Sequence, residues 1–160
     1  MTDQDKFVAS AKRVIDAEAA ALTTLSATLG PSFGEAVTLL LNAKGRVIVS
    51  GMGKSGHIAR KMAATFASTG TPAHFVHPAE ASHGDLGMVA EGDVLIVLSN
   101  SGETPELADI LAHAKRFGIP LIGVGLAYAE GYFRQSLDAN GWQVETYLNA
   151  DPELLPVEQV

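Results

Sequence analysis

The chain has 160 residues, 47% of them hydrophobic and 18% charged, which is typical of a folded domain and unlike a disordered chain. Its net charge of −7, with only 11 Lys and Arg residues, argues against a nucleic-acid partner. The absence of cysteine excludes disulfides and thiolate metal sites and is compatible with the cytoplasm, where we expect the protein. The acidic N-terminus is unlike a signal peptide, and the longest strongly apolar run (Val94 to Leu98) cannot span a bilayer, so no membrane partner is expected.

Two helices are predicted before the first strand. Apolar residues recur at three- and four-residue steps over 5–29, and Gly30 and Pro31 end this helix because proline cannot continue the hydrogen-bond ladder. Ser32 is predicted to cap a second helix that Gly45 closes. The residues of this helix expected to face inward are Val37, Leu40 and Leu41. The apolar stripe of the first helix could pack on the chain's own sheet or cover a second copy.

Strands and helices then alternate. Strands are predicted at 46–50, 73–76, 94–98, 121–124 and, more weakly, 143–147, and helices at 58–68 and 105–117. The last of these helices is expected to bury the stripe Leu107, Ile110, Leu111, Ala114 and Phe117. Several strands are unbroken apolar runs, which indicates a parallel sheet covered by helices on both faces.

A glycine-rich loop, 51–56, joins the first strand to the following helix and reads GMGKSG. It matches the G-x-G-x-x-G of dinucleotide sites, but the acidic residue expected after the second strand is missing, since that strand runs into His77. A P-loop is excluded because Ile48 stands where a glycine is required. The loop can still bind an anion through its backbone at Gly53, the Ser55 hydroxyl and the Lys54 charge. The alternative is a tight turn with a solvated lysine.

A second loop, 99–104, follows the third strand and reads SNSGET. It gathers hydrogen-bonding groups at a strand's carboxyl end, where open α/β sheets bind ligands. The candidate phosphate-binding residues are Ser99, Asn100, Ser101, Gly102 and Thr104. Helix capping would explain Thr104, which precedes Pro105, but not the two serines.

Three segments in order, VIVSGMGKSGH, HPAEASHGDLGMV and VLIVLSNSGETPEL, resemble the SIS (sugar isomerase) domain. Within that family they are most similar to the D-arabinose 5-phosphate isomerases. The resemblance covers about residues 40–124 and implies a flavodoxin-like three-layer α/β sandwich with a five-stranded parallel sheet. We expect one domain over 1–160, with N-terminal helices at 1–44, a family-like core at 45–124 and a divergent part at 125–160.

The resemblance implies interconversion of D-ribulose 5-phosphate and D-arabinose 5-phosphate through an enediol, a step toward the Kdo sugar of lipopolysaccharide. It implies catalytic roles for Lys54 and Glu106, with the serine-rich loop holding the phosphate. Lys54 would neutralise the enediolate oxygen, and Glu106 would act as the base if burial and a nearby anion raised its pKa. Alternatively, Glu106 only complements the helix dipole.

The resemblance also implies sugar contacts for His77 and His83, and a further substrate contact at Gly70 and Thr71. It suggests zinc at His77, where the metal would be adventitious or inhibitory, and requires no cofactor. The sequence itself contains no metal motif. On the alternative reading, the two histidines only form hydrogen bonds within a loop.

The match weakens after Val124. A second catalytic glutamate of the family aligns with Glu153 only if about six residues are inserted. The family's closing helix, a later histidine and two CBS modules are not matched, so the C-terminal part is interpreted as truncated or divergent. Such domains pack as dimers and tetramers, which implies a homodimer or homotetramer.

Three functions remain open at this point. The first is a sugar-phosphate isomerase that needs no redox cofactor. The second is a non-catalytic sugar-phosphate-binding SIS module or sensor, which the unmatched C-terminal elements favour. The third is a nucleotide-binding Rossmann protein, which the missing acidic residue and the serine-rich loop disfavour.

Overall fold

The computed structural model describes residues 2–102, 104–125 and 145–147, and the chain divides into two compact units, 1–29 with 148–160 and Gly30–Tyr147. The first unit contains α1 (Asp3–Thr28), which buries none of its residues and exposes most of its large apolar side chains. Its N-terminus is closed by a capping box. The Thr2 backbone N–H and hydroxyl donate to the Asp5 carboxylate at 2.7 and 2.8 Å, and these bonds hold the pKa of Asp5 below its usual value.

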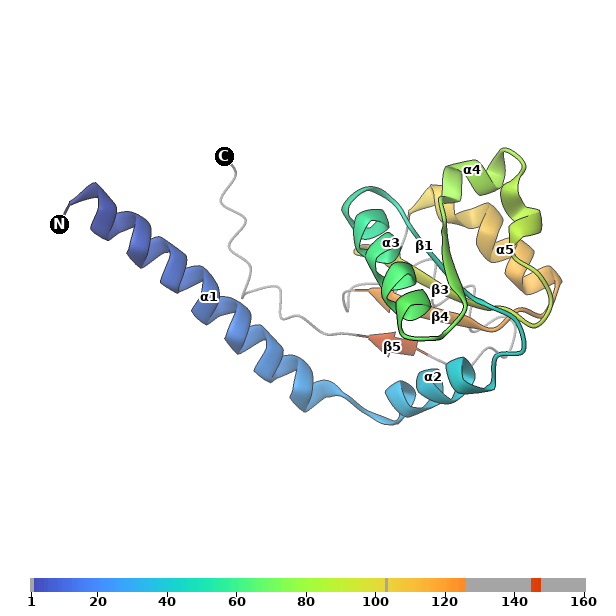
Figure 1. The fold of residues 1–160 in the computed structure, drawn as a ribbon, viewed down its shortest axis with the longest axis horizontal. Helices are drawn as coiled ribbons and strands as arrows, with labels where there is room; N and C mark the ends of the chain where they lie inside the picture. The colour runs from blue at the N-terminus through green and yellow to red at the C-terminus, as the bar shows by residue number, and fades with distance from the viewer. Residues whose placement is uncertain (1, 103, 126–144, 148–160) are drawn as a thin grey trace. The chain divides into compact units, whose positions relative to one another are not determined.

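The second unit is built on a five-stranded sheet (Figure 1). The strands are β1 (Val47–Gly51), β2 (Ala73–Val76), β3 (Val94–Ser99), β4 (Leu121–Gly125) and β5 (Glu145–Tyr147). They lie in the order β2-β1-β3-β4-β5, and every neighbouring pair is parallel. This is the flavodoxin-like order, and it confirms the predicted sheet. Residues 143 and 144 of the predicted fifth strand lie outside the described residues.

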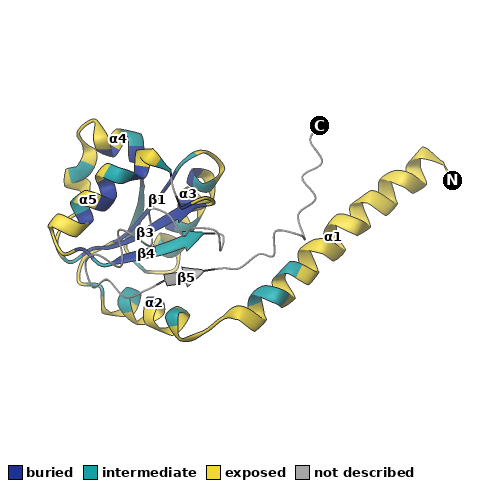
Figure 2. Ribbon diagram, turned by 180° about the vertical axis from the view of Figure 1, so that it is seen from behind, coloured by how far each residue is buried: buried dark blue, intermediate teal, exposed yellow. Residues whose placement is uncertain are grey.

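Helices cover both faces of the sheet. They are α2 (Pro31–Asn42), α3 (Gly53–Ser68), α4 (Pro78–Ser82) and α5 (Ala108–Arg116), with 3₁₀ turns η1 (Asp85–Met88) and η2 (Pro105–Leu107). Val47 and Val49 of β1 pack in one core with α2 and α3, while Ile48 points into the other with α4 and α5. The side chains of successive strand residues therefore pack in opposite cores. Both β1 and β3 are buried throughout (Figure 2). The predicted three-layer sandwich is confirmed.

Helix α2 differs from its prediction in both caps and in its buried face. Its N-cap is Gly30, and Pro31 is the first helical residue, so the predicted Ser32 cap is wrong. Proline suits the first helical position because a backbone N–H there has no hydrogen-bond acceptor within the helix. The helix ends at Asn42, before Gly45. Leu41 is 80% exposed and Val37 37% exposed, contrary to prediction. Leu40 packs on the core as predicted, and the other residues of that face are Ala36 and Leu39.

The predicted helix over 105–117 begins as the 3₁₀ turn η2 and becomes α-helical at Ala108. Its stripe is buried as predicted except at Phe117, which is the C-cap and is 51% exposed. The Phe117 ring lies 4.7 Å from the His113 ring, with Arg116 over it, so it covers the helix end and not the sheet. Among the described helices, none is long and apolar enough to cross a membrane.

Candidate functional site

The carboxyl ends of β1, β2 and β3 form the edge that carries most of the predicted site residues. Gly51 at the end of β1 is in register with Leu98 of β3, and Ser50 with Val76 of β2. Because β1 lies between β2 and β3, the segments that follow these strands meet at one edge. This is also where the strand order reverses, the position at which open α/β sheets bind ligands.

The loop after β1 is shorter than predicted, because α3 begins at Gly53 and not at 58. Met52 is its N-cap, and Lys54 and Ser55 therefore lie in the first helical turn. Gly53 adopts a φ of 52°, a left-handed angle that glycine tolerates without cost. The first turn of a helix presents unpaired backbone N–H groups and a positive dipole end. The exposed Lys54 side chain adds a full charge there, so this helix end favours an anion.

Gly56 lets α3 approach β1 closely. Its backbone N–H donates to the Met52 carbonyl at 3.1 Å, and the residue is buried. A Cβ at this position would lie 2.6 Å from the Gly51 carbonyl oxygen, which no side chain tolerates without a backbone shift. The last glycine of the motif therefore holds the helix N-terminus against the end of β1.

The serine-rich loop is closed by hydrogen bonds of its own. The Ser99 hydroxyl accepts from the Gly102 backbone N–H at 3.0 Å and lies 2.9 Å from the Thr104 hydroxyl. Ser99 is only 4% exposed, so its hydroxyl braces the loop from inside. The loop is thereby held in one shape beside the N-terminus of α3, with Asn100 and Ser101 exposed at its tip.

Thr104 is the N-cap residue of η2, but its side chain makes no capping hydrogen bond. Thr104 thus stands at the predicted N-cap position before Pro105, but its hydroxyl is paired with that of Ser99 and does not cap the helix. Glu106 lies in the first turn of η2 and is exposed. The described part of the chain therefore does not enclose Glu106, although a buried position was expected for a catalytic base.

His77 and His83 lie at the two ends of α4, as its N-cap and C-cap. His77 directly follows β2 and reaches the same edge as the two loops; its Nδ1 is buried and has no hydrogen-bond partner among the described residues. His83 is exposed. No group of three or more potential metal ligands is found in the described ranges, and zinc at His77 stays a prediction to which we assign no step.

Two predicted contacts lie elsewhere. Gly70 and Thr71 precede β2, at the opposite edge of the sheet from His77, which follows that strand. Thr71 and His77 are six residue steps apart along β2, a span of about 20 Å at roughly 3.3 Å per step. The structure therefore does not bring Gly70 and Thr71 to the same edge as the other candidates. Glu153 lies outside the described residues.

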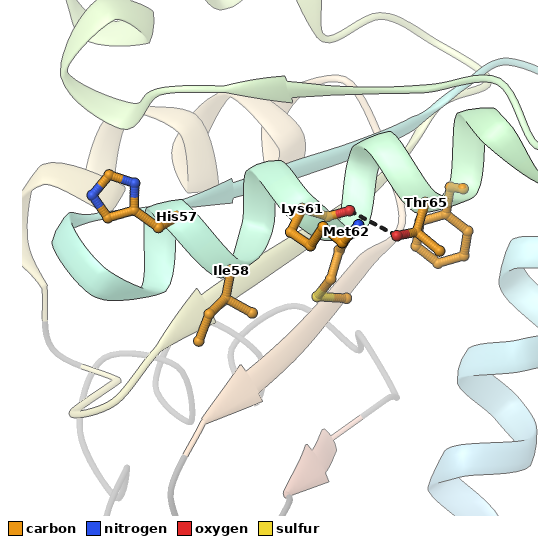
Figure 3. A pocket seen from close by; sticks show the side chains of 6 residues that line it. His57, Ile58, Lys61, Met62 and Thr65 are labelled. Carbon is orange, nitrogen blue, oxygen red and sulfur yellow. Dashed lines mark hydrogen bonds between the residues drawn. The ribbon is translucent and has the colours of Figure 1, made fainter.

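A pocket of ≈ 430 Å³ lies along the exposed side of α3 (Figure 3). Its described lining residues are His57, Ile58, Lys61, Met62, Thr65 and Phe66. They form two adjacent rows at four-residue steps, and the Thr65 hydroxyl donates to the Lys61 carbonyl at 2.9 Å. None of them is a predicted site residue, so this pocket is separate from the candidate site.

His113 supports the segment that follows His83, a role for which the sequence contains no signal. The His113 Nε2 atom lies 2.8 Å from the Val89 carbonyl oxygen and donates to it, because a carbonyl can only accept. This bond ties α5 to the end of the η1 segment. No pattern in the sequence connects two residues 24 positions apart in this way.

Comparison with known proteins identifies the family. Residues 39–130 match the family model of the SIS domain. The chain belongs to the SIS domain family. The SIS match includes β1, β2, β3 and β4, and therefore both loops of the candidate site.

Two curated relatives are arabinose 5-phosphate isomerases named KdsD. That of Pseudomonas aeruginosa is 54% identical over 124 residues, 78% of this chain and 38% of the relative. That of Salmonella typhi is 52% identical over 116 residues, 72% of this chain and 35% of the relative. The chain thus spans little more than a third of the length of these relatives.

Solved structures share the fold. The Escherichia coli CFT073 protein c3406, in complex with arabinose 5-phosphate, superposes with a TM-score of 0.86 at 36% identity, over 100% of this chain and 81% of that one. A phosphoheptose isomerase from Francisella tularensis superposes with a TM-score of 0.67 at 18% identity, over 96% and 88% of the two chains, which shows the fold alone.

Proposed function

We propose that this SIS domain binds a pentose phosphate at the carboxyl edge of β1 and β3 and interconverts D-ribulose 5-phosphate and D-arabinose 5-phosphate. One observation carries the proposal: the N-terminus of α3, with Lys54, lies beside a serine-rich loop braced by Ser99. The names of the KdsD relatives and the sugar-phosphate complex of c3406 support this choice of sugar. The product would supply Kdo synthesis for lipopolysaccharide.

The phosphate would bind the serine-rich loop, where Asn100 and Ser101 are exposed. Backbone N–H groups at the first turn of α3 would add a favourable dipole. The bonds of Ser99 to Gly102 and Thr104 hold this loop in shape before a ligand arrives, which lowers the entropy cost of binding.

The isomerisation moves a proton between C1 and C2 of the sugar through an enediol. A base must remove the proton bonded to carbon, and a positive group must stabilise the negative oxygen that develops. Lys54 would stabilise that oxygen, and Glu106 would be the base. His77 and His83 would contact the sugar hydroxyl groups from the ends of α4.

A second function, a sugar-phosphate-binding module without turnover, is favoured by the exposure of Glu106. An exposed side chain is not held by its surroundings at a fixed distance from a substrate carbon, as a general base must be. Both functions need the phosphate site, and only the first needs the base.

Proton exchange separates the two functions. The protein is incubated with D-arabinose 5-phosphate in D₂O, and the C2 proton is followed by NMR. Loss of the C2 signal together with formation of ribulose 5-phosphate supports the isomerase, and Lys54→Met should abolish both. Saturable ligand-induced shifts without exchange support the binding module. If the protein shows no exchange and no binding, both functions are refuted.

We also propose that the chain forms a homo-oligomer. The support is α1, a 26-residue helix with exposed Phe7, Ile15 and Leu22 side chains. A second copy is one surface that could cover this apolar stripe.

A further inference from the structure

Three side chains form a connected row between α3 and the end of β2. The Arg60 guanidinium lies over the Phe75 ring, with its Cζ atom 4.3 Å from the ring centroid. The Phe75 ring in turn meets the His77 ring edge-on, with centroids 6.1 Å apart and an interplanar angle of 72°. Both contacts fall within the ranges of attractive cation–π and T-shaped aromatic pairs.

The row ends at a residue of the candidate site. Phe75 and His77 are two positions apart along extended backbone, so their side chains project from the same face of the sheet, the face that α3 covers. Phe75 packs in the core beneath α3, with its ring tip near Gly56. Arg60 belongs to the same helix, whose first turn carries Lys54.

A functional histidine is usually oriented by a hydrogen bond to the ring nitrogen that faces away from its ligand. In the part of the chain that the structure describes, the buried Nδ1 of His77 has no such partner. The edge-on contact with Phe75 is then the described ring contact available to orient His77. Phe75 is itself held from one side by the Arg60 guanidinium.

We propose that Arg60 is a positioning residue: through Phe75 it sets the orientation of the His77 ring at the candidate site. The proposal rests on the proposed function, since His77 matters there as a sugar contact. Arg60 acts by fixing one ring against another, so its loss should weaken recognition of the sugar and leave recognition of the phosphate intact.

The test compares Arg60→Met with a matched control, Arg116→Met. Arg116 makes the same kind of contact at the end of α5, with its Cζ 5.4 Å from the Phe117 centroid, and the Phe117 ring is tilted by 45° against the His113 ring. Each variant thus removes the cation–π contact of one arginine with a phenylalanine ring that itself contacts a histidine ring. Long-range ¹H–¹⁵N spectra of the imidazole rings are recorded for each protein. His77→Gln assigns the His77 resonances.

Arg60→Met should move the His77 ring resonances and leave those of His113 unchanged, and Arg116→Met should do the reverse. Arg60→Met should also weaken binding of D-arabinose 5-phosphate, or raise KM where turnover occurs, by about two- to five-fold, which is the worth of an exposed cation–π contact. The kcat should change little. Arg60→Lys, which keeps the cation, should restore most of the binding.

Inorganic phosphate separates positioning from simple charge loss. If Arg60 acts only as a distant positive charge, Arg60→Met weakens phosphate binding as much as sugar-phosphate binding, and the proposal is overturned. Unchanged His77 resonances, or a loss confined to kcat, overturn it equally. If the unmutated protein neither binds nor exchanges the sugar phosphate, the proposed function fails, while the His77 resonances still decide whether Arg60 orients this ring.

Discussion

Replacing Ser99 with alanine should destabilise the whole domain, although the substitution removes one oxygen atom. The Ser99 hydroxyl accepts from the Gly102 N–H and pairs with the Thr104 hydroxyl. Each bond contributes about 0.5–1.5 kcal/mol net, and a buried N–H left without an acceptor costs about 1–3 kcal/mol. Because Ser99 is 4% exposed and Gly102 is buried, water cannot replace the lost oxygen. We expect the free energy of unfolding to fall by about 2 kcal/mol, or about 4–8 °C in Tm.

Urea unfolding followed by circular dichroism measures this loss, and calorimetric titration with inorganic phosphate measures the accompanying loss of affinity. The matched control is Ser68→Ala, which removes an exposed hydroxyl bonded to the Thr65 carbonyl at 2.9 Å. Its effect should stay within about 0.5 kcal/mol. If Ser99→Ala unfolds at the same urea concentration as the control and binds phosphate normally, the loop is not held by the Ser99 hydroxyl and our account of the site is wrong.

Three further predictions concern other parts of the chain. Gly56→Ala should lower the free energy of unfolding by about 1–3 kcal/mol, because its Cβ meets the Gly51 carbonyl. The same change at Gly34, inside α2 with open space around it, should raise that free energy by about 0.5–1 kcal/mol, so equal Tm shifts for the two variants contradict this reasoning. Lys54→Met should lower phosphate affinity without changing Tm, because the side chain is exposed; a large drop in Tm would instead make it structural. Leu22→Glu, on the exposed apolar stripe of α1, should reduce the molar mass measured by light scattering; an unchanged oligomer mass excludes that surface as the contact.

The layers of the fold were predictable from the sequence because each central strand is a distinct apolar run. The side chains of an unbroken apolar run such as Val94–Leu98 are all buried only when helices cover both faces of the strand. The structure places this run in the middle of the sheet. Helix ends were predicted less well. The pattern indicates Pro31 as the end of one helix, but it begins the next, because proline is compatible with a first turn and a sequence pattern does not distinguish the two uses.

The candidate site was predictable as a set of loops but not as a set of contacts. The two motifs follow neighbouring strands, and their meeting at one edge was expected from parallel topology. The pairing of the Ser99 and Thr104 hydroxyls was not expected, because capping offered Thr104 an equally good local partner. Contacts across the fold, such as Arg60 over Phe75, leave no periodic signal in the sequence.

The strand order also has a consequence for folding kinetics. The central pair, β1 with β3, joins residues far apart in the chain: the Asp93 carboxylate accepts from the Arg46 backbone N–H at 2.7 Å across 47 positions. Such a pair forms only after a long loop has closed, which makes its formation slow. Because the two loops of the site meet only after that closure, an anion that binds between them stabilises the finished domain. We therefore expect phosphate to slow unfolding while leaving the rate of folding nearly unchanged.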